Sequence, residues 1–448
     1  MRTLFGVGRP FQGRRKGEPE RLALLLTVCF AAVLSAASPD GTTDLHRAIS
    51  VNDLARTEAL IRAGADVNAT NRYGVTPLSL AAASGNASLL DLLLKAGANT
   101  KAADAALRDG RTLVMLAART GNADAINELV AKGGNVNAAE TRTGSTALMW
   151  AAVEDHPAAI RALIAAGADV NARSKVTHYP HTPPGVIGDA LEEGASYVGQ
   201  SVLPKGGWTA LMYAARQGSL DAARALAECG ADVKAADEDG TPALTFAIIN
   251  GHYDLASLLV YKGADVNQPD RTGATPLYSA VDMHTLATSF GRPDLPIAVA
   301  QRSLEMAVTL LTHGADPNKA LKTKVLKRVY NPGDARLAEG ATPLMRAAKS
   351  GDVAMMDILI TYGADLDRAN AAGETALHIA VASPKVVRFL TDEGASAEIR
   401  NARGLTPLEA ILKTNNPNAE SVALLRDLTG DYSTQPSPDA AAGRRRAQ

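Results

Sequence analysis

Short apolar segments that end at glycines recur along this chain, and residues 208–234 (WTALMYAARQGSLDAARALAECGADVK) show the pattern clearly. Leu211, Ala214 and Ala215 lie three and four residues apart, which places them on one face of a helix. Thr209 precedes them and can accept a hydrogen bond from an unpaired N–H of the first helical turn. Gly218 then interrupts the pattern. The stretch predicts a short helix over 210–217.

A second helix follows from the same kind of pattern. Leu220, Ala223 and Leu226 repeat the helical spacing, and Gly230 supplies a residue suited to the left-handed conformation that ends many helices. Helices of two or three turns are marginal alone in water, where even alanine-rich ones need about 12–15 residues. The unit is therefore helix, turn, helix and loop, and it must pack against neighbouring units.

Copies of the unit occur ten times. The successive distances between their cap positions are 33, 36, 34, 63, 33, 33, 67, 33 and 31 residues, so the period is 33 with two large excesses. Several copies carry proline directly after the cap, at the first helical position, where no N–H is needed. The cap positions are Thr43, Thr76, Thr112, Thr146, Thr209, Pro242, Thr275, Thr342, Thr375 and Thr406.

The repeated residues resemble the ankyrin repeat family. The segments TPLSLAA from Thr76, TALMWAA from Thr146, TPLMRAA from Thr342 and TALHIAV from Thr375 share one frame, with a central glycine and a terminal GADVN. The resemblance covers residues 40–430. It implies an all-α solenoid of about ten helix–turn–helix units joined by β-hairpin finger loops, with a concave groove where partners bind.

Some units depart from this pattern. Pro242 replaces the capping threonine, so we expect its helix to lack a side-chain cap. The first and last units are atypical, as expected of the ends of a solenoid, and residues 414–418 lengthen the turn of the last unit. The tail, 431–448, is predicted to be disordered. Its three consecutive arginines are read as a solvated end, with anion or membrane binding as the alternative.

Three insertions interrupt the repeat, at about 175–204, 285–302 and 319–338. The first and third fall between units four and five and between units seven and eight, so they lengthen two fingers on the same edge. The second falls between the two helices of unit seven, and we expect it to emerge from the opposite edge.

The first 37 residues differ from the rest. Six basic residues precede or begin an apolar run at 22–34, and Ser35, Ala36 and Ala37 follow it, which predicts a secretory signal peptide. The run is shorter than the about 20 residues that cross a bilayer. We expect an exported protein, periplasmic or extracellular. An uncleaved anchor in the inner membrane is the alternative, and membrane contact is expected only through this leader.

Composition narrows the function. Aromatic residues are 4% of the chain and apolar residues 46%, so the core is expected to be alanine and leucine. Without the leader, basic residues fall from 46 to 40 and acidic ones from 47 to 45, leaving a net charge near −5, which argues against nucleic acid as a partner. Cys229 is then the only cysteine. We expect a small buried thiol there, with a reactive role as the alternative. We also expect the protein to be a monomer that holds no cofactor.

Motifs of catalysis are few. The sequence after the leader contains no glycine-rich phosphate loop, HExxH pair or GxSxG elbow. His178 and His181, with Tyr179 between them, are compatible with metal binding, with partner contact or with an inert loop, because two histidines without a third ligand are a weak metal signal. By the resemblance, His46 and His378 tie adjacent repeats together by hydrogen bonds.

The resemblance also assigns binding positions: the residue before the cap, the finger tip and two exposed positions before the central glycine. Trp208 is the strongest candidate, since an aromatic side chain in a groove can anchor a partner, and packing beneath the long finger is the alternative. Trp150, Tyr213 and Phe246 share one position and are expected to pack between repeats. The assigned positions hold Tyr73, Arg111, Trp208, Arg216, Gln217, Asn250 and Lys349.

Together these features favour a non-catalytic scaffold that binds a protein partner of unknown identity through its concave groove and elongated fingers. The alternative is a secreted hydrolase or metal-binding protein whose site is formed by the inserted loops. A third possibility is an effector delivered into another cell.

Overall fold

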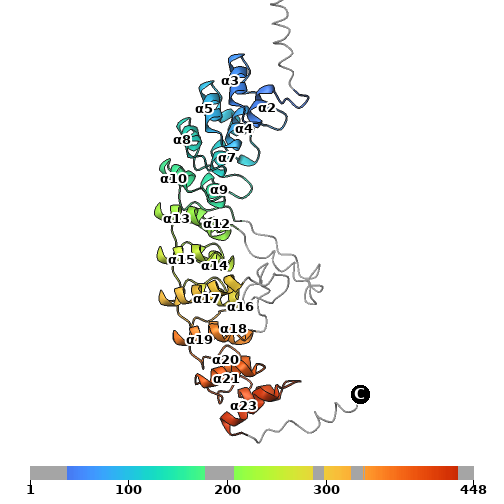
Figure 1. The fold of residues 1–448 in the computed structure, drawn as a ribbon, viewed down its shortest axis with the longest axis vertical. Helices are drawn as coiled ribbons and strands as arrows, with labels where there is room; N and C mark the ends of the chain where they lie inside the picture. Colours follow the sequence, from blue (N-terminus) through green and yellow to red (C-terminus); the bar gives the residue numbers. More distant parts are fainter. Residues whose placement is uncertain (1–37, 177–205, 286–296, 324–336, 338, 432–448) are drawn as a thin grey trace, which may run out of the picture.

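The computed structural model describes residues 38–176, 206–285, 297–323, 337 and 339–431, and these form ten stacked helix pairs (Figure 1). The first helices are α2 (Asp44–Ser50), α4 (Pro77–Ser84), α7 (Leu113–Arg119), α9 (Ala147–Val153), α12 (Ala210–Gln217), α14 (Ala243–Ile249), α16 (Pro276–Thr285), α18 (Pro343–Ser350), α20 (Ala376–Ala380) and α22 (Pro407–Leu412). The second helices are α3 (Leu54–Arg62), α5 (Ala87–Lys95), α8 (Ala123–Ala131), α10 (Pro157–Ala165), α13 (Leu220–Glu228), α15 (Tyr253–Tyr261), α17 (Ile297–Thr312), α19 (Val353–Thr361), α21 (Pro384–Asp392) and α23 (Ala419–Thr429).

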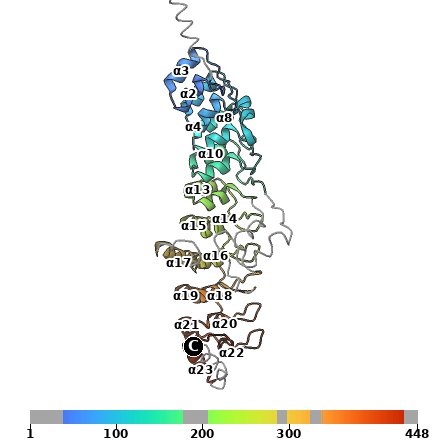
Figure 2. The same ribbon diagram turned by 90° about the vertical axis from the view of Figure 1, so that its right-hand side faces the viewer.

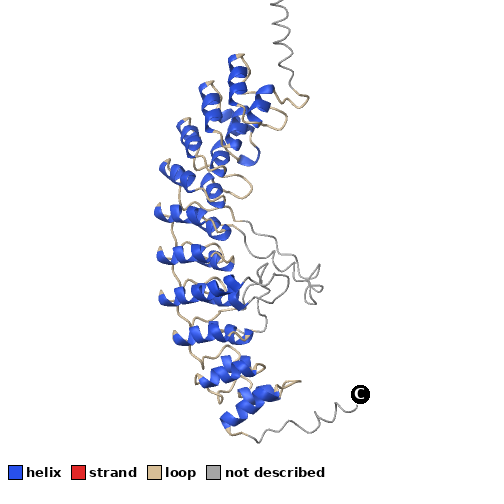
Figure 3. Cartoon of the chain, in the orientation of Figure 1, coloured by secondary structure: helices blue, strands red, loops and turns tan. Residues whose placement is uncertain are grey.

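The stack is a curved column. The second helices form its convex side, and the first helices line its concave side (Figure 1). The view turned by 90° shows the pairs following one another along a single axis (Figure 2). The described residues are helix and loop without a named strand (Figure 3). The all-α solenoid expected from the repeats is confirmed.

Each first helix begins where the sequence predicts. The threonine before the helix accepts a hydrogen bond from the backbone N–H three residues later, as Thr209 does from Met212 and Thr342 does from Met345. Proline occupies the first helical position in α4, α18 and α22. Pro242 caps α14 without a side-chain hydrogen bond, which confirms the lost cap. Local chemistry therefore sets the starts of these helices.

The core is built from alanine and leucine at the shared faces of neighbouring pairs. In unit five, Leu211, Ala214, Ala215 and Leu226 are at most 1% exposed. Small alanine side chains let helix axes approach closely, so short helices bury their apolar faces against neighbours on both sides. Cys229 follows α13, and it is half-buried where a buried thiol was expected.

Asparagines at the ends of the GADVN segments tie successive units. The Asn267 side-chain N–H donates to the carbonyl of Gly314 at 2.7 Å, and its Oδ1 accepts from the N–H of Asp316 at 2.8 Å. Asn137 makes the same two bonds, to Gly167 and Asp169. The aspartates of these segments close local turns, as expected: Asp265 accepts from the N–H of Asn267.

The finger loops are turns rather than strands. Among the described residues they contain two isolated antiparallel bridges, Ala139 with Thr146 and Ala236 with Pro242. The expected fingers are therefore hairpin-like turns without named strands in the described part of the chain. Side chains fix the turns instead: Asp270 Oδ1 accepts from the N–H groups of Thr272 and Ala274 at 2.9 and 3.0 Å. This arrangement is an Asx turn.

Two elements differ from the prediction. Helix α6 (Thr100–Ala106) and the 3-10 turn Arg108–Gly110 fill the finger between units two and three, where the repeat is three residues longer than 33. Helix α17 begins at Ile297, so residues 297–302 continue the helix and do not belong to the insertion expected at 285–302.

No helix among the described residues is long and apolar enough to cross a membrane.

The first and third insertions leave from closed finger bases. Ser174 N–H donates to the carbonyl of Trp208 at 3.0 Å, and Gly207 N–H donates to the carbonyl of Ser174 at 3.2 Å. Leu321 makes the equivalent pair with Ala341 and Gly340, at 3.0 and 2.8 Å. The leader (1–37), residues 177–205, 286–296, 324–336 and 338, and the tail from 432 lie outside the described residues.

Candidate functional site

Four aromatic side chains follow one another on the concave side of units four to six. Trp150, Tyr213 and Phe246 occupy the same position of α9, α12 and α14, and Trp208 precedes α12. The Trp208 ring lies 5.3 Å from the Tyr213 ring and 5.2 Å from the Phe246 ring, both edge to face. We call these four residues the aromatic ridge. The contact of Phe246 with Trp208 joins units six and five, which confirms packing between repeats at Phe246.

Trp208 belongs both to this ridge and to the base of the first elongated finger. Its indole Nε1–H donates to Asp237 Oδ2 at 3.3 Å, and its backbone N–H donates to Ser174 Oγ at 3.0 Å. The side chain remains half-exposed. These contacts place Trp208 at the base of the finger, and its role as an anchor for a partner stays a prediction.

Two exposed arginines stack on the tryptophans. The Arg216 guanidinium carbon lies 5.0 Å from the centre of the Trp208 ring, and that of Arg119 lies 5.8 Å from the centre of the Trp150 ring. Stacking holds a guanidinium in place while its edge N–H groups stay available. In the described part of the chain, neither guanidinium pairs with a carboxylate. We call Arg119 and Arg216 the stacked arginines.

A histidine of the following unit holds the backbone of each stacked arginine. His156 Nε2 lies 3.0 Å from the carbonyl oxygen of Arg119, and His252 Nε2 lies 3.2 Å from that of Arg216. Each ring packs over a glycine of the preceding unit, where an added Cβ would come within 2.6 Å at Gly121. This contact between the histidine and the arginine backbone was not predicted from the sequence. The signal was present, because each histidine lies ten residues after the cap position of its unit.

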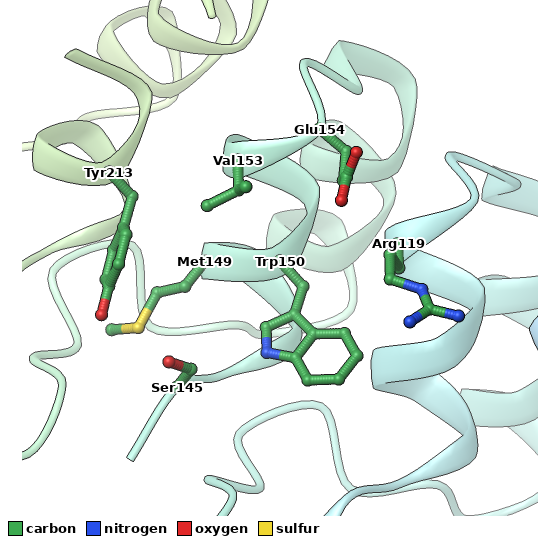
Figure 4. A pocket seen from close by; sticks show the side chains of 7 residues that line it. All are labelled: Arg119, Ser145, Met149, Trp150, Val153, Glu154 and Tyr213. Atoms are coloured by element: carbon green, nitrogen blue, oxygen red, sulfur yellow. The ribbon is translucent and has the colours of Figure 1, made fainter. Parts of the chain in front are cut away.

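A pocket of about 250 Å³ opens between Trp150 and Tyr213 (Figure 4). Its remaining lining is Arg119, Ser145, Met149, Val153 and Glu154. Sites for drug-sized molecules usually measure about 300–1,000 Å³. This pocket therefore suits one apolar side chain of a partner better than a cofactor.

The ridge ends at unit seven. Ser279 and Arg346 occupy the ridge position in α16 and α18, and Arg346 Nε donates to Asp282 Oδ1 at 2.8 Å. Both partners of this pair are nearly buried, with side chains 9% and 13% exposed. The concave side therefore changes from aromatic to ionic between units six and seven.

The predicted binding residues are only partly brought together. Trp208 precedes α12 and Arg216 and Gln217 end it, with Arg216 stacked on the Trp208 ring; Asn250, exposed at the end of α14, lies in the next unit. The rest lie apart. Tyr73, 51% exposed, contacts Arg72 in the finger before α4, Arg111 precedes α7, and Lys349 lies on α18. His178, Tyr179 and His181 lie outside the described residues.

One cluster resembles a hydrolytic triad. Ser303 Oγ lies 2.6 Å from His284 Nδ1, and His284 Nε2 lies 3.1 Å from Asp352 Oδ2. Ser303 is 0% exposed, so its hydroxyl cannot reach a substrate, and Asp352 also caps α19 through Met355. The cluster joins units seven and eight. Within the described residues, no group of three or more histidine, cysteine or acidic side chains could hold a metal ion.

A family model of ankyrin repeats in three copies matches residues 15–104, 100–174, 196–270, 234–320 and 295–401. The chain belongs to the ankyrin repeat family. The match agrees with the stacked pairs and with the repeated TPL-type helix starts. It also confirms the resemblance that the sequence motifs indicated.

Individual relatives share only part of their length with this ankyrin repeat chain. The mouse ankyrin repeat and SAM domain-containing protein 6 is 34% identical over 90 residues, 19% of this chain and 10% of that protein. Human protein phosphatase 1 regulatory subunit 27 is 35% identical over 74 residues, 16% of this chain and 48% of that protein. The ankyrin repeat domain of human ASB11 is 24% identical, with a TM-score of 0.41, over 64% of this chain and 99% of that one.

Proposed function

We propose that the protein is a non-catalytic scaffold that captures a protein partner on its concave side, at the aromatic ridge of units four to six. The main support is that partly exposed tryptophans, stacked arginines and a pocket the size of one side chain occur at one place. Tryptophan, tyrosine and arginine are the residues most enriched at energetic centres of protein interfaces. Ankyrin repeat relatives support a role in protein–protein interaction.

The site works as a preformed surface. The fingers, Asn ties and histidine contacts hold the backbone on both sides of the ridge, so few side chains need to be ordered when a partner binds. Lower ordering cost leaves more of the interaction energy as affinity. We further propose that the protein acts after export and that the first elongated finger, whose base contains Trp208, adds to the contact.

Substituting Trp208 tests the ridge. We expect Trp208→Ala to weaken partner capture from the exported fraction by about 2 kcal/mol or more, roughly 30-fold. Lys349→Ala, two units beyond the ridge and on the ionic part of the concave side, should change capture by less than about three-fold. Partner recovery at graded protein concentrations, with circular dichroism of each variant, measures both. Equal losses in the two variants would contradict a ridge-centred site.

Removing the first insertion tests the finger. A chain without residues 175–204 should keep its helicity and lose affinity for the same partner, because these residues are in excess of the 33-residue repeat. Retained affinity would limit the site to the ridge and exclude the finger.

A further inference from the structure

Resting on the proposed function, we infer that the ridge recognises an extended acidic peptide segment whose two carboxylates flank one central apolar side chain. Arg119 and Arg216 supply the two cations, and the pocket between Trp150 and Tyr213 takes the apolar side chain. The order along the column is cation, pocket, cation, because Arg119 ends α7, the pocket lies between α9 and α12, and Arg216 lies near the end of α12.

The spacing of the units sets the spacing of the peptide. Arg119 and Arg216 belong to units three and five, two steps apart, and packed helices lie about 8–10 Å apart, which gives roughly 16–20 Å. An extended chain advances about 3.3 Å per residue. The two acidic residues should therefore be about five or six positions apart, with the apolar residue two or three positions after the first.

Charge near the pocket refines the pattern. Arg142 and Lys175 are exposed on the neighbouring fingers, whereas Glu154 lines the pocket and Glu238 is exposed on the finger after α13. The described residues of units three to five carry more acidic than basic side chains, so attraction for a carboxylate is local and comes from the two stacked arginines. Glu154 lies between the stacked arginines along the column, so an acidic residue beside the central apolar position should be disfavoured.

The histidine contacts preorganise this arrangement. Both stacked arginines have their carbonyl oxygens within 3.0–3.2 Å of a histidine of the next unit, and both guanidinium groups are stacked on an indole. A guanidinium already held flat loses less side-chain entropy on meeting a carboxylate.

Tryptophan fluorescence gives a direct readout, because Trp150 and Trp208 are the two tryptophans of the chain and both belong to the ridge. The probe is the synthetic peptide EGSLSGE, titrated into the full chain at low salt. Matched peptides replace the first glutamate, the second or both with glutamine, replace the leucine with glycine, or shorten and lengthen the spacers by two residues.

We expect EGSLSGE to change the fluorescence saturably. Each glutamate-to-glutamine change should weaken binding about two- to five-fold, and loss of the leucine about ten-fold or more. Arg216→Ala and Arg119→Ala should abolish the preference for glutamate over glutamine at one end each. Glu154→Gln should tighten binding, and about 0.5 M salt should weaken it.

A random heptapeptide library selected on the wild-type chain distinguishes failure of the acidic-peptide proposal from failure of the proposed binding site. Enriched peptides that need Trp150 and Trp208 but carry no paired acidic residues would overturn the acidic pattern and leave the ridge as a binding site. Enriched peptides indifferent to Trp150→Ala and Trp208→Ala would overturn the ridge itself. Absence of enrichment, together with no response to EGSLSGE, would count against both.

Discussion

At the scale of single residues, the residue at the cap position explains how the first helix of most units begins and why unit six differs. In α4 the pair is reciprocal: Ser79 N–H donates to Thr76 Oγ1 at 3.1 Å, and Thr76 N–H donates to Ser79 Oγ at 2.9 Å. Unit six breaks the pair, because Pro242 has neither a hydroxyl nor an N–H. The partner left over is Thr245, whose buried Oγ1 has no hydrogen-bond partner among the described residues.

Restoring the cap should stabilise the protein. Pro242 has φ −79° and ψ 164°, close to Thr209 at −81° and 166°, so Pro242→Thr needs no backbone shift. It adds an acceptor for the Thr245 N–H and a donor to Thr245 Oγ1. A cap is worth about 1 kcal/mol and a satisfied buried hydroxyl about 1–3, against roughly 0.4–1 lost with the proline.

We expect a net gain of about 1 kcal/mol or more in the free energy of unfolding, measured from the urea midpoint. Pro242→Val is the matched control, since valine lacks the hydroxyl that accepts the bond from Thr245. Valine restores the backbone N–H, so a gain of the same size in the valine variant would show that this N–H or the loss of the proline ring, and not the side-chain cap, is responsible.

The sequence predicts where a residue lies in the repeat better than it predicts which side chains that residue contacts. The family resemblance assigns Trp208 to the groove, and the position that Tyr213 and Phe246 share in the repeat predicts that they pack between repeats. It does not show that Arg216 lies over Trp208 or that His252 reaches the carbonyl of Arg216, since these contacts depend on rotamers and on the offset between stacked units. The positions of the proposed binding surface could therefore be expected from the sequence, whereas the contacts among its side chains come from the structure.

At the scale of elements, the helix pairs followed from the sequence and the irregular segments did not. A seven-residue helix such as α6 lies in a finger that is only three residues longer than the norm, too small an excess to signal a helix. Its position depends on a tertiary contact: Asp104 Oδ1 accepts from the N–H of Leu113, at the start of α7, at 2.7 Å. Burial raises the pKa of Asp104. Making this contact therefore requires a carboxylate to be partly removed from water.

The closed base of the first elongated finger makes the insertion separable from the stack. A Cβ on Gly206 would lie 3.2 Å from the Cα of Val176, so the two ends already meet in space. Deleting residues 177–205 and joining Val176 to Gly206 should leave the melting temperature unchanged or slightly higher, because a shorter loop costs less closure entropy.

Thermal unfolding followed by circular dichroism at 222 nm measures this effect. Keeping Gly206 matters, since it has φ 114° and its added Cβ would lie 2.0 Å from the carbonyl oxygen of Lys175. The same deletion with Gly206→Ala serves as the destabilised comparison. A fall of more than about 5 °C in the plain deletion would mean that the insertion packs on the helix pairs.

At the scale of the whole molecule, the solenoid has acid-sensitive ties in units one and nine, close to its two ends. His46 Nε2 lies 3.0 Å from the carbonyl oxygen of Val75, and His378 Nε2 lies 3.0 Å from that of Leu405, as the family resemblance led us to expect. In both, Nδ1 accepts from the N–H of the capping threonine at 3.3 Å. The ring must therefore be neutral, with its proton on Nε2.

Acidification should loosen both ends before the middle. Burial lowers the pKa of His46 and His378 below 6.5, more than the carbonyl oxygens of Val75 and Leu405 raise it. The unfolded chain then binds more protons than the folded one, so this stability is complete above about pH 6.5 and is lost as the pH falls through the lowered pKa. Protonated Nδ1 cannot accept from the cap, so α2 and α20 lose part of their capping box.

Hydrogen exchange at pH 7 and pH 5, corrected for intrinsic rates, measures the effect helix by helix. We expect the protection of α2 and α20 to fall relative to that of α12, whose third residue is Met212, because a stacked array opens locally where its interfaces weaken. The double variant His46→Gln with His378→Gln keeps a neutral capping partner and should remove the difference. If wild type and double variant lose end protection equally at pH 5, carboxylates elsewhere control the response, and the two histidines serve only as packing groups at each end of the column.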